Sequence, residues 1–208
     1  ILVREGKVHG VKARSGIYSA PVVVDAAGPF SRAVCETAGV RIPVTPDSHE
    51  AAITEPVKPF FTTMVVDLRP GPDSKNYYFY QNSLGQVVFC ITPEPLIVGS
   101  DKRETSVFLT QVGARMVNLL PRLKNLRVRR MWRGLYPMTP DGSPLVGWNT
   151  QVQGLLHATG MCGQGFMLGP GVGQVVARMI TGKTSEEDKI ILQGFDPYRK
   201  FGGQEALK

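Results

Sequence analysis

The first forty residues alternate short apolar runs with turn residues. Residues 2–13 predict two strands around a tight turn, and Gly16 opens a further short strand, so a small antiparallel ribbon is expected. Residues 21–28 form a continuous apolar run that ends in small residues, which is typical of a strand buried on both faces of a sheet. Residues 31–38 then predict a short helix that Gly39 ends.

The pattern changes between residues 43 and 130, where short β-like runs follow one another. This spacing predicts an antiparallel sheet with hairpins at residues 82–85 and around Pro93. The expected strands are residues 51–54, 62–68, 77–81, 86–91 and 96–100. One helix interrupts them, beginning near Thr105 or Ser106 and ending before Pro121, and we expect it to cover one face or edge of the sheet. Its apolar positions are Leu109, Val112, Met116, Leu119 and Leu120.

Residues 131–182 return to the glycine-rich style of the beginning and hold the most informative stretch. Residues 152–158 predict a buried strand, which a turn with glycines at 160, 163 and 165 joins to a helix that Gly182 ends. The apolar face of this helix is Val172, Val175, Val176, Met179 and Ile180.

Such a turn aims backbone N–H groups and a positive helix end at one point, which suits an anionic ligand or a charge-accepting ring. A second interpretation stays open on glycine spacing alone. Gly169, Gly171 and Gly173 would then serve only to let two backbones pack closely.

Composition narrows the class of protein. The 208 residues are 42% hydrophobic and 20% charged, which is typical of a soluble globular chain with one or two domains. No apolar run reaches the length of a membrane span, and the first residues lack the order of a signal peptide. The three cysteines are odd in number and far apart, which argues against a disulfide framework and against a zinc site. A reducing, cytoplasmic setting is therefore expected.

The net charge of +7 raises the question of nucleic acid. The basic run consists of Lys124, Arg127, Arg129, Arg130 and Arg133. Its alternation is typical of the polar face of a strand, and no aromatic residues for base stacking interleave with it. We therefore predict no nucleic-acid partner.

Three segments in this order and spacing, 22–31, 133–147 and 159–173, resemble the flavin-dependent amine and amino-acid oxidoreductases of the D-amino-acid-oxidase-like family. That family includes glycine oxidase, sarcosine oxidase and dimethylglycine dehydrogenase. The resemblance implies an α+β fold, in which the remainder of an α/β flavin-binding domain joins an antiparallel β-rich substrate domain with a covering helix. The expected boundaries are 1–42 and 131–183 for the flavin-binding domain, 43–130 for the substrate domain, and 184–208 for a polar tail that docks through residues 195–198.

The resemblance also implies that the cofactor is FAD. By the family's pattern, Ala26, Ala27 and Gly28 pass beside the FAD diphosphate or ribose. The residues that wrap the isoalloxazine ring are Gly160, Met161, Gly163, Gln164, Gly165, Phe166 and Met167. Gly134 stands where single-chain sarcosine oxidases carry a cysteine bonded to flavin, so we expect the flavin to be noncovalent at this position.

Five residues are implied to meet the substrate. Tyr136 matches a position over the flavin where relatives place a tyrosine or arginine. Gln164 and Met167 replace a histidine and a lysine of relatives, which leaves the substrate open. His49 resembles the entry into the substrate domain. By strand alternation, Tyr78 and Tyr80 share a face that can line the substrate cavity. Each aromatic or histidine also has a structural alternative: Tyr136 as a core aromatic, His49 as a packing residue, and Tyr78 with Tyr80 as a cross-strand pair.

The family's reaction removes hydride from the carbon next to the nitrogen of a small amine or amino acid such as sarcosine, glycine, dimethylglycine or proline. Members begin with a βαβ unit whose GxGxxG turn binds the FAD diphosphate, and these 208 residues do not contain it. We therefore expect the C-terminal part of a longer flavoenzyme, with a homodimer or a partner subunit covering the sheet edge near residues 22–25. Two alternatives stay open: a 2-hydroxy-acid dehydrogenase on the same fold, and a non-catalytic subunit that binds partners.

Overall fold

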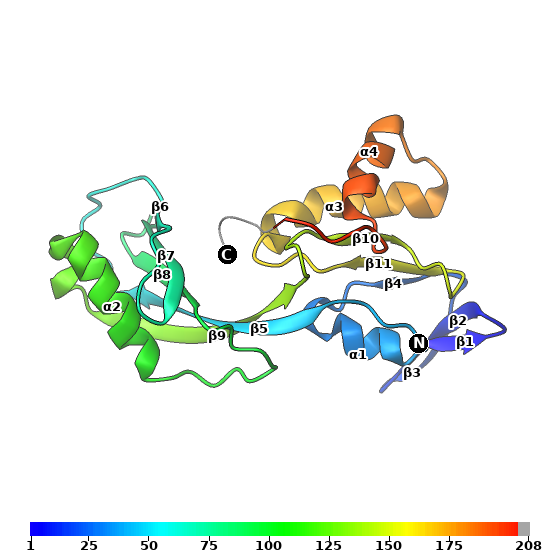
Figure 1. Ribbon diagram of the computed structural model, residues 1–208, viewed down its shortest axis with the longest axis horizontal. Helices are drawn as coiled ribbons and strands as arrows, with labels where there is room; N and C mark the ends of the chain where they lie inside the picture. Colours follow the sequence, from blue (N-terminus) through cyan, green and yellow to red (C-terminus); the bar gives the residue numbers. More distant parts are fainter. Residues whose placement is uncertain (204–208) are drawn as a thin grey trace. The chain divides into compact units, whose positions relative to one another are not determined.

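The computed structural model describes residues 1–203, and its elements are labelled in Figure 1. The chain divides into two compact units. Of the described residues, the first unit contains 1–46 and 136–203, and the second contains Asp47–Leu135. Helices and sheets are mixed in both units, which agrees with the α+β class expected from sequence.

The first unit opens with the expected ribbon. β1 (Leu2–Arg4), β2 (Lys7–Ala13) and β3 (Gly16–Ser19) form an antiparallel sheet in that order. Two residues with positive φ, Glu5 (49°) and Gly6 (71°), make the tight turn between β1 and β2. The alternating pattern of residues 2–13 was therefore interpreted correctly.

A second sheet of the first unit has the order β10 (Leu145–Trp148), β11 (Leu155–Thr159), β4 (Val23–Asp25). β10 and β11 are antiparallel, whereas β11 and β4 run parallel. The 3-10 helix η1 (Gly28–Phe30) and helix α1 (Ser31–Glu36) follow β4. The core beside this sheet contains Val8, Cys35, Val40, Ile42, Val44, Leu145, Val152 and Leu155.

The expectation that β4 is buried on both faces was wrong. Val23 and Val24 are only half-buried, and Asp25 is the one buried residue of the strand. β4 is the outer strand of its three-stranded sheet in the described chain, so only one side of it has a hydrogen-bonded neighbour. A continuous apolar run cannot by itself distinguish a central strand from an outer one.

Helix α3 (Gly165–Thr181) begins several residues before its apolar periodicity and ends at Gly182, whose φ is 68°. Gly169, Gly171 and Gly173 thus lie inside the helix. A Cβ atom added at any of the three would meet no atom of the described chain within 4 Å. Within the described residues, the close-packing interpretation of these glycines is therefore wrong.

The segment after Gly182 contains a helix that sequence analysis missed. α4 (Glu186–Phe195) begins with a reciprocal capping box, in which Ser185 Oγ accepts from Asp188 N and Asp188 accepts from Ser185 N. Arg178 of α3 donates to both carboxylate oxygens of Asp188, at 2.7 and 2.6 Å. The Ser185–Asp188 spacing was visible in the sequence, but the polar composition of the segment favoured a tail instead.

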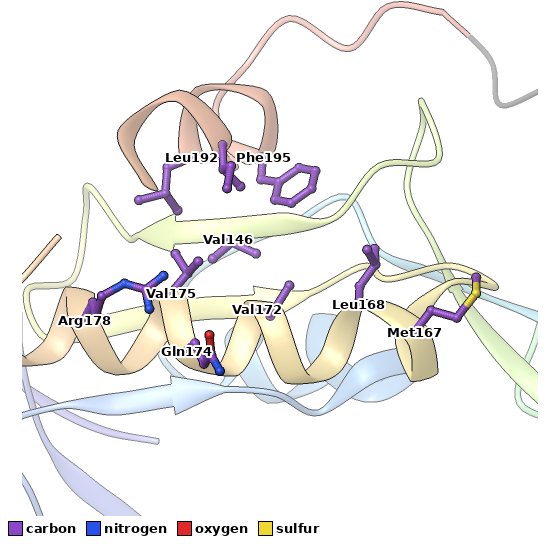
Figure 2. Close-up of a pocket in the computed structure, with 11 residues that line it drawn as sticks. Val146, Met167, Leu168, Val172, Gln174, Val175, Arg178, Leu192 and Phe195 are labelled. Carbon is purple, nitrogen blue, oxygen red and sulfur yellow. The ribbon is translucent and has the colours of Figure 1, made fainter. Parts of the chain in front are cut away.

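An apolar groove of about 420 Å³ lies between α3, α4 and β10 (Figure 2). Leu168, Val172 and Val175 of α3 line it together with Leu192 and Phe195 of α4. The predicted docking at residues 195–198 is confirmed, because Tyr198 Oη accepts from Asn149 Nδ2 at 2.8 Å and from the backbone N–H of Thr150 at 3.0 Å. The last part of the expected tail, residues 204–208, lies outside the described residues.

The second unit is a five-stranded sheet with one face covered by a helix. Its order is β6 (Val65–Asp67), β7 (Ser74–Gln81), β8 (Val87–Pro93), β5 (Thr45–Thr54), β9 (Val128–Met138). β7 and β8 form the predicted hairpin at residues 82–85. Helix α2 (Val107–Leu119) is followed by the 3-10 helix η2 (Pro121–Asn125). The buried residues of α2 pack on one face of the sheet. Phe108, Val112 and Met116 belong to one core with the sheet residues Ala52, Tyr77, Phe79, Val87, Phe89 and Ile91.

The predicted strand at residues 96–100 was wrong, and so was the hairpin around Pro93. Val98 makes a single antiparallel bridge to Asp47, and the remainder of the segment is irregular. Pro95, directly before this segment, lacks the N–H that a strand ladder requires, and the apolar side chains 96–98 are exposed.

Candidate cofactor-binding site

Two loops of the first unit leave the same edge of a parallel strand pair. Leu155, Leu156 and His157 of β11 pair in parallel with Val23, Val24 and Asp25 of β4. The carboxyl ends of both strands therefore point the same way, and the loops 26–28 and 160–164 start side by side. In open α/β sheets, ligands bind at this edge, between the loops that follow neighbouring strands.

Two buried hydroxyl groups tie the loops together. Ser31 Oγ lies 2.6 Å from Thr159 Oγ1, and Thr159 Oγ1 also donates to the carbonyl oxygen of Gly28 at 3.4 Å. Both Ser31 and Thr159 are buried. The predicted segments 26–28 and 160–167 are thus brought together by residues that the sequence did not single out.

The glycine-rich loop has two residues in the left-handed region. Gly160 has φ of 68°, and a Cβ added there would lie 2.5 Å from Thr139 Cγ2. Cys162, with φ of 50°, is the second. Its thiol is buried, 3.6 Å from Thr139 Oγ1 and 3.4 Å from the carbonyl oxygen of Gly160. A strained non-glycine residue at a loop tip is a recognised mark of a functional segment, and sequence analysis missed it.

Helix α3 starts directly after this loop, so residues 165–167 form its first turn instead of a wrapping loop. Within the described residues, no side chain caps the helix start at Gln164. Phe166 and Met167 are 97% and 74% exposed. The first turn therefore offers backbone N–H groups and the positive end of a 17-residue helix beside the loop edge.

Tyr136 lies against the same loop. A Cβ added at Gly163 would be 3.0 Å from Cε2 of the Tyr136 ring, so the absence of a side chain at Gly163 allows this contact. Tyr136 is half-buried on β9. The structure thus places the predicted residues Tyr136 and Gly163 together, which spacing along the chain could not show.

A buried polar network lies beneath the two loops, and sequence analysis missed it. Asp25 Oδ2 lies 3.2 Å from Cys35 Sγ and 3.5 Å from His157 Nδ1, and Asp25 Oδ1 accepts from the backbone N–H of Ala27 at 3.2 Å. Asp25, Cys35 and His157 are at most 2% exposed. The carboxylate therefore connects β4, α1 and β11 to the loop at 26–28.

The ionisation of the network follows from burial and hydrogen bonding. Burial alone would raise the pKa of Asp25, but hydrogen bonds from His157, Cys35 and Ala27 outweigh it and lower that pKa. Burial, followed by the nearby charge of Asp25, raises the pKa of the Cys35 thiol well above its ordinary value. Cys35 is therefore held as a thiol.

Aspartate, cysteine and histidine are also metal-ligand types, and the three ligand atoms lie within 4.8 Å of one another. The orientation of Asn149 decides whether these three residues form a metal site or a hydrogen-bonded network. Its Oδ1 accepts from the backbone N–H groups of Gln151 and Val152, so its Nδ2 faces His157 Nε2 at 3.2 Å. Nε2 therefore accepts, and the ring proton sits on Nδ1, where it donates to Asp25. Hydrogen bonding accounts for this cluster without a metal ion.

Three other predicted residues belong to the second unit. His49 is buried, with its Nε2 2.9 Å from Asp47 Oδ2. Tyr78 is half-buried and pairs across the strands with Cys90, whose pKa burial raises to about 11. Gly134 lies in β9, with open space where a side chain would stand. The roles of these three residues toward the cofactor or the substrate stay predictions.

The sequence profile of the family described as FAD dependent oxidoreductase matches residues 1–179. The chain belongs to this family. Among curated relatives, glycine oxidase of Pseudomonas putida is 30% identical over 178 residues, which cover 86% of this chain and 46% of the relative. A D-amino acid dehydrogenase of Cereibacter sphaeroides is 30% identical over 206 residues, covering 96% and 44%. The chain thus spans about half the length of the curated relatives it matches.

Solved structures agree with this membership. L-proline dehydrogenase from P. horikoshii is 31% identical, with a TM-score of 0.84, and the match covers 95% of this chain and 52% of that one. Glycine oxidase from Geobacillus kaustophilus, at 24% identity and a TM-score of 0.81 over 95% and 50%, shows the same fold. No helix of residues 1–203 has the length and apolarity needed to cross a membrane.

FAD is the cofactor of this family. The loop edge fits such a group on three counts. Its two loops lie side by side, the space beside Gly28 is open to 4 Å among the described residues, and a long helix starts there without a capping side chain.

Proposed function

We propose that the protein to which this chain belongs is an FAD-dependent oxidoreductase that oxidises the carbon–nitrogen bond of a small amine or amino acid. Family membership and the similarity to glycine oxidase and L-proline dehydrogenase support this proposal. The single observation that carries it for this chain is the pairing of the two loops at the carboxyl edge of β4 and β11. When bound, FAD supplies the hydride acceptor.

The residues of the loop edge would hold the cofactor through backbone groups. Ala26, Ala27 and Gly28 form the loop that Asp25 orients, and we assign them to the diphosphate or ribose. The second loop and the first turn of α3 are assigned to the isoalloxazine ring: Gly160, Met161, Gly163, Gln164, Gly165, Phe166 and Met167. The positive helix end favours the negative charge that a reduced flavin carries.

The reaction depends more on how the substrate is positioned against the flavin than on a protein side chain that acts as a base. The bound ammonium group first loses a proton to solvent, which frees the nitrogen lone pair. As hydride leaves the carbon for the flavin, this lone pair forms the carbon–nitrogen double bond, and water then hydrolyses the imine product. The residues assigned to substrate binding are Tyr136, Gln164, Met167, His49 and Tyr78. We further propose that the GxGxxG unit is supplied by another part of the protein, by a second copy, or by a partner subunit.

The first experiment is to incubate the purified chain with FAD, remove free flavin by gel filtration, and record the visible spectrum of the protein peak. We expect the flavin band in a protein that contains the GxGxxG unit as well as this chain. Under anaerobic conditions, sarcosine, proline or glycine should then bleach that band. Bleaching by 2-hydroxyglutarate alone would instead indicate a 2-hydroxy-acid dehydrogenase. Retained flavin that no substrate bleaches would contradict the proposed reaction.

Tyr136→Phe in the complete enzyme tests the position of the phenol. Loss of one hydrogen bond to a charged substrate group is expected to raise KM about 10-fold while FAD content stays unchanged. Tyr18→Phe, the same chemical change on the exposed strand β3, is the matched control and leaves KM as it was. Steady-state kinetics with the preferred amine measure both. An unaltered KM for Tyr136→Phe would remove this residue from the substrate site.

A further inference from the structure

The carboxylate of Asp47 carries a polar atom that the described chain does not satisfy. Asp47 is 1% exposed, and its Oδ2 lies 2.9 Å from His49 Nε2. Its Oδ1 is buried and has no hydrogen-bond partner among residues 1–203. A buried carboxylate oxygen without a donor costs free energy that a folded protein seldom leaves uncompensated, so this atom points to a ligand with a donor group.

Asp47 and His49 lie on the face of the β5 strand that is opposite α2. Alternate residues of a strand point to opposite faces, and Ala52 is part of the core beneath α2. Ser48 and Glu50 share the side of Ala52, where they bond to Asp101 and Thr105. The contact between Asp47 and His49 confirms that these two residues point the other way together.

The neighbours on that face are small, apolar or neutral. Ala51 pairs with Cys90, and Cys90 pairs with Tyr78, so all three side chains share the face of His49. Ala51 and Tyr78 are half-buried, which leaves the face partly accessible. Of the groups named on it, Asp47 is the only acid. A ligand that meets Asp47 therefore combines one N–H-bearing cationic group with small apolar substituents.

We propose that Asp47 binds the ammonium group of the amine substrate, and that His49 is a positioning residue that holds the carboxylate. This inference rests on the proposed function and names the residue that recognises the nitrogen. An ionised carboxylate only accepts hydrogen bonds, so His49 Nε2 donates to Oδ2 and leaves Oδ1 for the substrate N–H. A charge-assisted bond of this kind is about twice as strong as a neutral one and selects amines over 2-hydroxy acids.

The neighbouring acid Glu50 provides a matched control. Thr105 donates to both of its oxygens, from the backbone N–H at 2.5 Å and from Oγ1 at 2.7 Å. Glu50 is 7% exposed, and it lies one residue along the chain on the opposite face of β5. Glu50→Gln therefore removes the same charge as Asp47→Asn without touching the proposed ligand position.

The test compares Asp47→Asn with Glu50→Gln in the complete, flavin-loaded enzyme. Asp47→Asn is expected to raise KM for the amine about 10- to 100-fold with little change in FAD content, whereas Glu50→Gln leaves KM within about two-fold. An ether analogue, in which oxygen replaces the amine nitrogen, is expected to bind both variants and the wild type equally, as measured by perturbation of the flavin spectrum. Equal KM values for Asp47→Asn and wild type would overturn the proposal.

A measurement on the wild type alone covers the case in which Asp47→Asn does not fold. Competitive inhibition by a non-oxidisable ammonium analogue is compared with inhibition by its neutral ether counterpart. We expect the cation to bind at least about 10-fold more tightly, and equal binding would overturn the proposal. If no amine bleached the wild-type flavin, the proposed function itself would be contradicted. If an amine bleached the flavin but its KM were the same in Asp47→Asn and wild type, only the role of Asp47 would be contradicted.

Discussion

Asp25→Asn is expected to lower the free energy of unfolding by about 3 kcal/mol, because one buried carboxylate accepts from three donors. An amide keeps one acceptor oxygen and places an N–H₂ group against the Nδ1–H of His157 or the thiol of Cys35. At least one buried donor then has no acceptor. Chemical denaturation of the purified chain at neutral pH measures the loss.

Asp196→Asn is the matched control, because Asp196 lies exposed at the end of α4 and its carboxylate accepts from the backbone N–H of Tyr198, a bond that the Asn oxygen can keep. This variant is expected to change stability by less than about 0.5 kcal/mol. If Asp25→Asn were equally mild, the network would contribute little to the fold.

The same carboxylate predicts a pH dependence. The folded-state pKa of Asp25 is lower than its ordinary value of 3.8, so its ionised form stabilises the folded chain. This contribution is complete above the ordinary value and is lost as pH falls through the lowered folded-state pKa. The stability difference between wild type and Asp25→Asn should therefore narrow as pH falls below about 4. A difference that stays constant down to pH 2 would contradict this assignment.

Gly160→Ala is expected to have the second large effect. Alanine in the left-handed region costs about 1 kcal/mol, and its Cβ would lie 2.5 Å from Thr139 Cγ2 and 3.3 Å from Leu145 Cγ. Together with the overpacking, the loss of stability is about 2–4 kcal/mol. Because Gly160 opens the second loop, FAD retention by the complete enzyme should fall as well, as measured by the flavin absorbance of the gel-filtered protein.

Gly113→Ala makes the same chemical change inside helix α2, where an added Cβ meets nothing within 4 Å. It is expected to stabilise the chain by about 0.5–1 kcal/mol and to leave FAD retention unchanged. Retention of FAD by Gly160→Ala at the wild-type level would show that the conformation of this loop does not matter for the cofactor.

Sequence reasoning succeeded where a structure depends on neighbours along the chain. The ribbon β1–β3, the β7–β8 hairpin and the end of α3 at Gly182 follow from alternation, turn residues and a left-handed glycine. It failed where composition was followed ahead of a local signal, as at α4, whose Ser185 capping box stood within a polar segment. It also failed at residues 96–100, where an apolar run follows two prolines and makes a single bridge instead of a ladder.

For the candidate site, the sequence by itself determined the strand, the glycine turn and the helix that place backbone N–H groups at one point. Only the tertiary structure decided what lies beside them. β4 and β11 are parallel neighbours although about 130 residues separate them, and contacts such as Ser31–Thr159 and Cys35–His157 join residues 128 and 122 positions apart. The physical reason is that turns and helix ends depend on nearby backbone geometry, whereas a buried carboxylate takes its partners from whichever strands the core brings together.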